Sequence, residues 1–123
     1  MPETMSTSRT VLITVPPASE ASPRGPVYGG WIMTQIDHAA GLAGSKVSGG
    51  DALILSIKEM VFHAALTVGT EFTITAEVTR RGRTSFDLAL TGTADPDGAA
   101  QQIVSSSVTM VAVYADGTPR PLP

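Results

Sequence analysis

The residue of this chain best suited to acid–base chemistry is Asp37, a carboxylate inside an otherwise apolar stretch. It is the only acidic residue between Glu20 and Asp51. Its neighbours at helical spacing include Met33 and Gly41, and neither of them can pair with its charge. A carboxylate in such surroundings is costly to bury, so we expect it to face solvent, a partner or a cleft. A plain solvent-facing position and a role as a general base both remain open at this point.

Two glycines, Gly29 and Gly30, stand directly before Trp31 at the expected start of the same helix. Glycines leave the backbone N–H groups unshielded, and a helix N-terminus carries partial positive charge. A carbonyl oxygen placed there would be polarised, so the pair is a candidate oxyanion site. The simpler interpretation is that the glycines only allow a tight turn into the helix.

Three of the chain's eight basic residues cluster at an expected hairpin turn, together with a glycine and two hydroxyl residues: Arg80, Arg81, Gly82, Arg83, Thr84 and Ser85. Guanidinium groups and hydroxyls next to a glycine are suited to binding phosphate groups. A solvated hairpin tip is the commoner meaning of a charged turn, and both interpretations stay open.

The two histidines give little indication of a catalytic or metal-binding role. His38 follows Asp37 directly, so the two side chains diverge by about 100° around a helix. His63 lies at the end of an expected strand, and we expect a structural role for it. With two histidines and no cysteine, we expect no metal site. The sequence also lacks the motifs of serine hydrolases, NTPases and dinucleotide-binding proteins.

Hydrophobic periodicity indicates the elements that must position these residues. A helix is expected from Val27 or Tyr28 to about Ala43, because apolar residues recur at helical spacing: Ile32, Ile36, Ala39 and Ala43. A proline-rich loop precedes the helix at 16–26. Strands are expected at 9–15, 52–62, 72–79, 86–90 and 103–114. The last four strands are predicted to form a meander.

One helix cannot cover both faces of a five-stranded antiparallel sheet, so the sheet must curl around the helix. The predicted class is therefore α+β with a hotdog fold, in which the sheet wraps one long central helix. The chain of 123 residues is expected to form one domain over 1–123, with a loose N-terminus at 1–8 and an extended C-terminal tail at 115–123.

Composition narrows the function classes. Hydrophobic residues make up 42% of the chain and charged residues only 15%, against ~25% in typical soluble domains. So little charge suggests that partner subunits cover part of the surface. The net charge of −3 argues against a nucleic-acid-binding protein. Because no apolar run approaches ~18 residues, we expect no membrane span and a cytoplasmic location.

The segment from Val27 to Asp37, VYGGWIMTQID, resembles the YciA-like acyl-CoA thioesterases of the hotdog superfamily. In that family Gly-Gly is followed by an apolar stretch and then by Asp, seven residues after the second Gly. The similarity continues through Met60–Phe62, Arg81–Ser85 and the tail from Gly117 to Pro123. It covers nearly the whole chain, and four segments in the same order make it specific.

This resemblance implies hydrolysis of acyl-CoA thioesters to a carboxylic acid and free CoA, with no separate cofactor because CoA enters as part of the substrate. The family's helix Asp acts as a general base or as a nucleophile, and that role falls on Asp37. The amides of Gly29 and above all Gly30 would hold the thioester oxygen. The segment from Arg81 to Ser85, assisted by Arg120, would bind the CoA phosphates. The sites would be shared within a homo-oligomer, with a dimer as the unit of a tetramer or hexamer.

Two positions depart from the family pattern. Ser22 stands where the family usually has Asn in the loop before the glycines, and Arg24 stands where a second Asn can occur. We expect both side chains to contact the substrate, Ser22 through its hydroxyl and Arg24 through anionic groups. The loss of the Asn favours an alternative, a non-catalytic protein that binds or senses acyl-CoA. A hotdog dehydratase is disfavoured, because the adjacent Asp37 and His38 cannot share one helix face.

Overall fold

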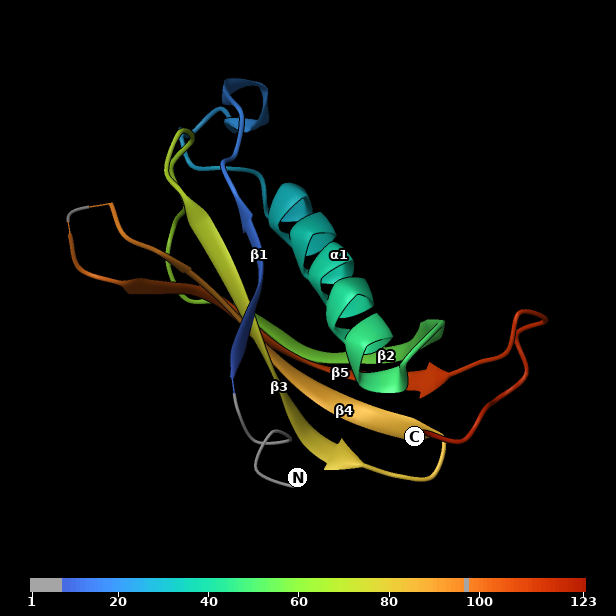
Figure 1. The fold of residues 1–123 in the computed structure, drawn as a ribbon. Helices are drawn as coiled ribbons and strands as arrows, with labels where there is room; N and C mark the ends of the chain where they lie inside the picture. Colours follow the sequence, from blue (N-terminus) through green and yellow to red (C-terminus); the bar gives the residue numbers. More distant parts are fainter. Residues whose placement is uncertain (1–7, 97) are drawn as a thin grey trace.

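A computed structural model describes residues 8–96 and 98–123 (Figure 1). It contains one long helix, α1 (Gly29–Ser48), and a short 3-10 helix, η2 (Ala18–Glu20). The strands are β1 (Arg9–Thr14), β2 (Ala52–Phe62), β3 (Phe72–Arg81), β4 (Ser85–Ala94) and β5 (Gln101–Ala112). All pairings between them are antiparallel, and the sheet curves around α1 (Figure 1). The expected α+β class, with five strands wrapped around one helix, is confirmed. The expectation of a loose N-terminus falls mostly on residues 1–7, outside the described residues.

The predicted meander of the last four strands is wrong. The strands lie in the order β1-β3-β4-β5-β2, so only β3, β4 and β5 follow one another as neighbours. The segment between β2 and β3 is longer than the two to five residues of a usual hairpin loop, and it contributes Leu66, which is only 1% exposed, to the core. The long connection lets β2 pair with β5 at one edge, while β1 pairs with β3 at the other.

Helix α1 is amphipathic as predicted but longer. The predicted stripe of Ile32, Ile36, Ala39 and Ala43 is buried against the sheet. The helix continues past Ala43 because Gly44 allows close approach to the sheet: a Cβ at that position would stand 2.6 Å from the Met110 Cε atom. It ends where Gly49 takes a left-handed conformation, with φ of 73°, and its N–H bonds the Ser45 carbonyl.

One edge of the sheet leaves large apolar side chains uncovered. Five side chains of β2 are 44–61% exposed: Leu53, Leu55, Ile57, Val61 and Phe62. An edge strand of this kind also presents unpaired backbone groups, and isolated proteins usually protect such edges with charges or short strands. Apolar exposure along one strand is typical of surfaces that bind another molecule.

No helix in the described part of the chain is long and apolar enough to cross a membrane.

Candidate functional site

Asp37 projects from the outer face of α1. Its side chain is exposed, while the adjacent Ile36 and nearby Ala40 are buried against the sheet. Met33 and Gly41, one turn to either side of Asp37, are exposed as well. The expectation that this carboxylate escapes burial is confirmed, and the described chain leaves it facing outward.

The two glycines form the first turn of α1, as predicted. Both are exposed, and a Cβ at Gly30 would meet nothing within 4 Å, so the chain's own packing does not require a glycine there. The first N–H groups of a helix have no partner within it. Among residues 8–96 and 98–123, no acceptor bonds the N–H of Gly29 or Gly30. These donors are therefore open to a ligand.

A hollow of about 430 Å³ opens beside the start of the helix. Gly29 and Ile32 line it from α1, while Phe62, His63 and Leu66 line it from the end of β2 and the loop that follows. The His63 Nε2 atom lies 2.7 Å from the Ser105 Oγ atom, a contact that holds the ring at the strand end. Sequence reasoning assigned no binding role to Phe62 or Leu66, because nothing in their local pattern links them to the glycines.

The distance between the two catalytic candidates is set by helix geometry. Gly30 and Asp37 are seven residues apart, so they lie about 20° apart around the axis, on nearly the same face. Along the axis, however, about 10 Å separates them. An oxyanion donor and a base must both lie within about 3 Å of the reacting groups. A carbonyl oxygen bound at the Gly30 N–H therefore lies about two helix turns from Asp37 of the same copy, farther than a direct hydrogen bond reaches.

The proline-rich loop folds back on itself just before α1. Ser22 and Gly25 form a turn closed by a 2.9 Å bond from the Gly25 N–H to the Ser22 carbonyl, and Arg24 is exposed within it. A backbone bridge between Ala21 and Val27 ties this turn to the start of the helix. Ser22 and Arg24 thus lie at the same end of the molecule as the glycine pair.

The predicted phosphate segment is the β3–β4 hairpin at the opposite end of α1 (Figure 1). The Gly82 N–H bonds the Ser85 carbonyl at 2.7 Å and closes the turn, with Arg83 exposed at its tip. The Thr84 carbonyl accepts the Ala112 N–H from β5. A helix of 20 residues is about 30 Å long, so the structure does not bring this hairpin and the glycine pair of one chain together.

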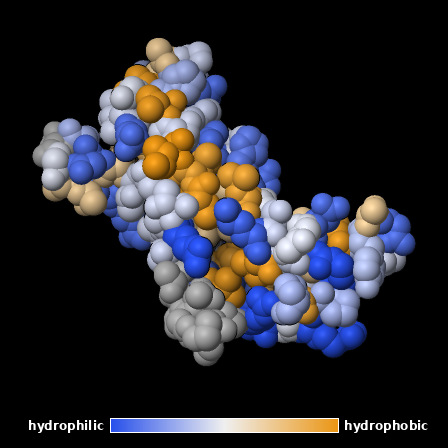
Figure 2. Space-filling view, in the orientation of Figure 1, coloured by the Kyte–Doolittle hydropathy of each residue, from blue (hydrophilic) through white to orange (hydrophobic). Residues whose placement is uncertain are grey.

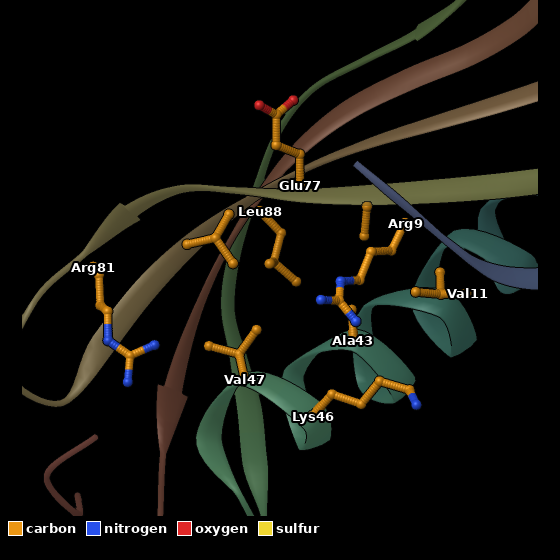
Figure 3. A pocket seen from close by; sticks show the side chains of 10 residues that line it. Arg9, Val11, Ala43, Lys46, Val47, Glu77, Arg81 and Leu88 are labelled. Atoms are coloured by element: carbon orange, nitrogen blue, oxygen red, sulfur yellow. The ribbon is translucent and has the colours of Figure 1, made fainter. Parts of the chain in front are cut away.

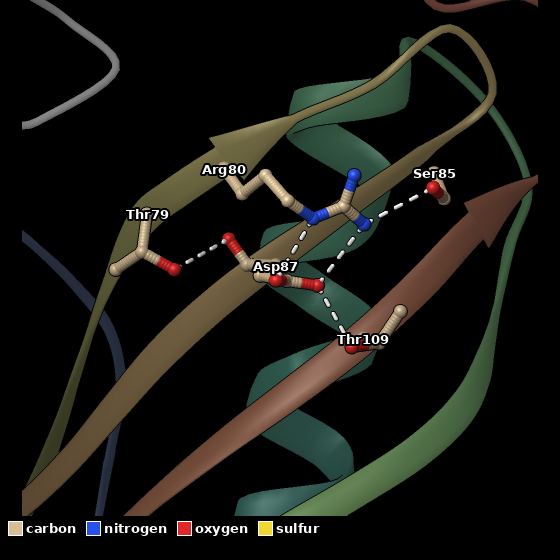
Figure 4. Close-up of polar contacts among 5 residues, drawn as sticks. All are labelled: Thr79, Arg80, Ser85, Asp87 and Thr109. Atoms are coloured by element: carbon tan, nitrogen blue, oxygen red, sulfur yellow. Dashed lines mark hydrogen bonds and ion pairs between the residues drawn. The ribbon is translucent and has the colours of Figure 1, made fainter.

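A shift in the β3–β4 register between Val78 and Arg80 divides the arginine cluster, because it turns Arg80 and Arg81 to opposite faces from those that regular alternation would give. Arg80 turns to the face of the sheet away from α1 and forms a bidentate ion pair with Asp87, with distances of 2.9 and 3.2 Å (Figure 4). Arg81 points to the helix side and donates a 2.6 Å bond to the Pro123 carbonyl. Arg80 therefore does not join Arg81 and Arg83 in one basic patch.

Arg120 is engaged at the C-terminal end of α1. Its guanidinium donates to the carbonyls of Ser48, Asp51 and Val113 at 3.0–3.3 Å. The bond to Ser48 satisfies one of the last carbonyls of the helix, where a positive charge is also favourable. These bonds hold the C-terminal tail against the end of the helix. That Arg120 also helps to bind the CoA phosphates stays a prediction.

The Arg80–Asp87 pair makes stability depend on pH. The Arg80 guanidinium, and after it the Thr109 hydroxyl, hold the pKa of the Asp87 carboxyl below its ordinary value. This contribution is complete above the unfolded-state pKa, about 3.9, and is lost as pH falls through the lower folded-state pKa. We expect Asp87→Asn to lower Tm at pH 7 by about 2–4 °C, because exposed pairs contribute little.

The measurement is thermal unfolding of both proteins from pH 7 to pH 2, with Asp95→Asn, an exposed carboxylate just past the other end of β4, as the control. The two Tm curves should converge at the acid end. A difference that stays constant with pH would show that the charge of Asp87 is not its cause.

Comparison with known proteins identifies the family to which the chain belongs. Residues 24–100 match the family described as the thioesterase superfamily. An acyl-CoA thioester hydrolase YciA of Salmonella typhimurium is 27% identical over 92% of this chain and 89% of its own length. An uncharacterized acyl-CoA thioester hydrolase of Zymomonas mobilis is 30% identical over 80% of this chain and 68% of its own length.

Solved structures agree with the sequence comparison. A hexameric hotdog fold thioesterase of Campylobacter jejuni superposes with a TM-score of 0.85 at 29% identity, covering 93% of this chain and 90% of that one. A hexameric acyl-CoA thioesterase without ligand gives a TM-score of 0.87 at 27% identity, covering 98% of this chain and 77% of that one. The resemblance that began with Gly-Gly and Asp is confirmed: this chain belongs to the thioesterase superfamily and has the hotdog fold.

Proposed function

We propose that this protein hydrolyses acyl-CoA thioesters to a carboxylic acid and free CoA, in sites that combine groups from two copies of the chain. The observation that carries the proposal is the placement of an exposed Asp37 and an open Gly30 amide on one face of α1, about 10 Å apart, in a member of the thioesterase superfamily. Its curated relatives named acyl-CoA thioester hydrolases support the substrate class.

A second copy would close the 10 Å gap. If two α1 helices pack antiparallel about a two-fold axis near Met33 and Thr34, Gly30 of one copy becomes level with Asp37 of the other. Exposed apolar surface supports such an assembly, on α1 at Met33 and Leu42 and along the edge strand β2. The hexameric thioesterases with the same fold support a homo-oligomer as well.

The chemistry then needs only this chain's groups and a water molecule. The Gly30 N–H, with Gly29 beside it, would hold the thioester oxygen as it becomes an oxyanion. Asp37 as general base would take a proton from the water that attacks the carbonyl carbon. The C–S bond would then break, and the CoA thiolate would leave and take up a proton. Asp37 as nucleophile would instead form an anhydride that water later hydrolyses.

The direct test is thiol release from a panel of acyl-CoA esters of different chain length by the unmodified protein. We expect turnover of at least one chain-length class. Tight binding of acyl-CoA without any thiol release would favour the non-catalytic alternative, for which the replacement of the usual Asn by Ser22 is the specific observation.

Phosphate binding at the β3–β4 hairpin has its own test. We expect Arg81→Ala with Arg83→Ala to raise KM for acyl-CoA by about tenfold or more, because charge-assisted hydrogen bonds to phosphate would be lost. KM for truncated acyl thioesters without the nucleotide should stay unchanged. Arg80→Ala is the matched control, since its guanidinium is paired with Asp87 on the other face. Equal effects on long and truncated substrates would contradict the assignment.

A further inference from the structure

A second cavity, of about 300 Å³, lies between the C-terminal half of α1 and strands β1, β3 and β4 (Figure 3). Its size is at the lower end of the ~300–1,000 Å³ found for small-molecule sites. Apolar side chains make its floor and walls: Val11, Ala43, Val47, Val78 and Leu88. In Figure 2 hydrophobic surface is exposed between β1 and α1, with hydrophilic groups on either side.

The rim of this cavity is positively charged. Arg9 reaches over it from β1, Lys46 stands on α1, and Arg81 lies at the far end of β3 (Figure 3). The one acidic lining residue, Glu77, directs its carboxylate away from the cavity (Figure 3). Within the part of the chain that the structure describes, the Arg80–Asp87 pair is the single ion pair, so no carboxylate neutralises Arg9 or Lys46.

An apolar floor under uncompensated cations is complementary to an amphipathic anion. We propose that this cavity binds a medium-chain alkyl carboxylate, with the chain on the valines and the carboxylate on Arg9 and Lys46. Arginine binds carboxylates through a matching pair of donors, and the apolar walls exclude water around the chain. That such an acid is also the product of the enzyme rests on the proposed function.

The cavity is separate from the proposed catalytic pair of Gly30 and Asp37, although Arg81 at its far end also belongs to the proposed phosphate-binding hairpin. Lys46 lies nine residues beyond Asp37, about 13 Å along the helix axis. The lining residues Ala43 and Val47 are on the side of α1 that packs on the sheet, whereas Asp37 is on the outer face. An acid bound here would therefore not occupy the place of the reacting thioester.

Calorimetric titration of the full chain with octanoate tests the proposal. We expect saturable binding with a Kd of about 1 mM or tighter, and at least tenfold weaker binding of acetate, which lacks the chain. The double variant Arg9→Gln/Lys46→Gln should weaken octanoate binding tenfold or more and leave octan-1-ol binding unchanged. Lys58→Gln, a cation of β2 outside the cavity, should change neither. Acetate binding as well as octanoate, or an unchanged Kd in the double variant, would overturn the proposal.

Substitutions that fill the cavity provide an independent test of the proposed binding. Val47→Phe should abolish binding of both octanoate and octan-1-ol, with folding checked by circular dichroism and Val78→Phe as the second variant. Octanoate binding should be the same in Asp37→Asn, and a loss there would place the acid in the reaction site and overturn the proposal. Octanoate binding requires no turnover, so it stands or falls separately from thiol release.

Discussion

Asp37→Asn is expected to reduce kcat for acyl-CoA hydrolysis by about 10²–10⁴-fold, with KM changed little. The amide keeps the size of the carboxylate but cannot accept the proton of the attacking water, and a positioned base contributes a factor of this order. Because the side chain is exposed in the described chain, the substitution removes no buried contact and should leave Tm nearly unchanged. Thiol release and thermal unfolding measure the two effects.

Asp95→Asn is the matched control, since Asp95 is an exposed carboxylate at the end of β4. It should leave both kcat and Tm unchanged. Full activity of Asp37→Asn would exclude Asp37 as base and as nucleophile. Equal losses in both variants would point to a general effect of charge.

Leu55→Lys is expected to dissociate the oligomer and abolish activity while leaving each chain folded. Leu55 is 61% exposed on β2, so a lysine is tolerated in the isolated chain. In a two-fold interface the substitution occurs twice, and two charges placed at a buried apolar contact should weaken dimerisation by about 10³-fold or more. Sedimentation velocity, together with thiol release from the same samples, measures the result.

Ile13→Lys is the control on the opposite edge of the sheet, where Ile13 of β1 is 56% exposed. It should retain the assembly and the activity. Dissociation by Ile13→Lys but not by Leu55→Lys would place the interface along β1. An active monomer would contradict the proposal that Gly30 and Asp37 act from different copies.

The two catalytic candidates show how much of the site the sequence could predict. The helical period determines which residues share a face, so the outward position of Asp37 follows from the buried stripe around Ile36 and Ala40. The same period also determines the 10 Å between Gly30 and Asp37. The helical period therefore predicted the two groups and their separation, whereas the prediction of a second copy came from the low charge and the family resemblance.

The arginine segment shows where local pattern failed. Arg80, Arg81 and Arg83 are neighbours in sequence, yet an irregularity in the β3–β4 register between Val78 and Arg80 turns Arg80 to the other face, where it pairs with Asp87. The Arg80–Asp87 contact joins two neighbouring strands, β3 and β4. A cluster of charges in one segment of sequence does not show on which face of the sheet each side chain lies.

By itself the sequence determined five strands, one amphipathic helix and the turns between them, because the periods of hydrophobic residues and the places of glycine and proline are local properties. Only the tertiary structure decided that β2 pairs with β5 at the edge, that Arg120 clamps the end of α1, and that Arg9, Lys46 and Arg81 surround one cavity. These features depend on contacts between residues far apart in the chain, which the packing of the sheet around the helix selects.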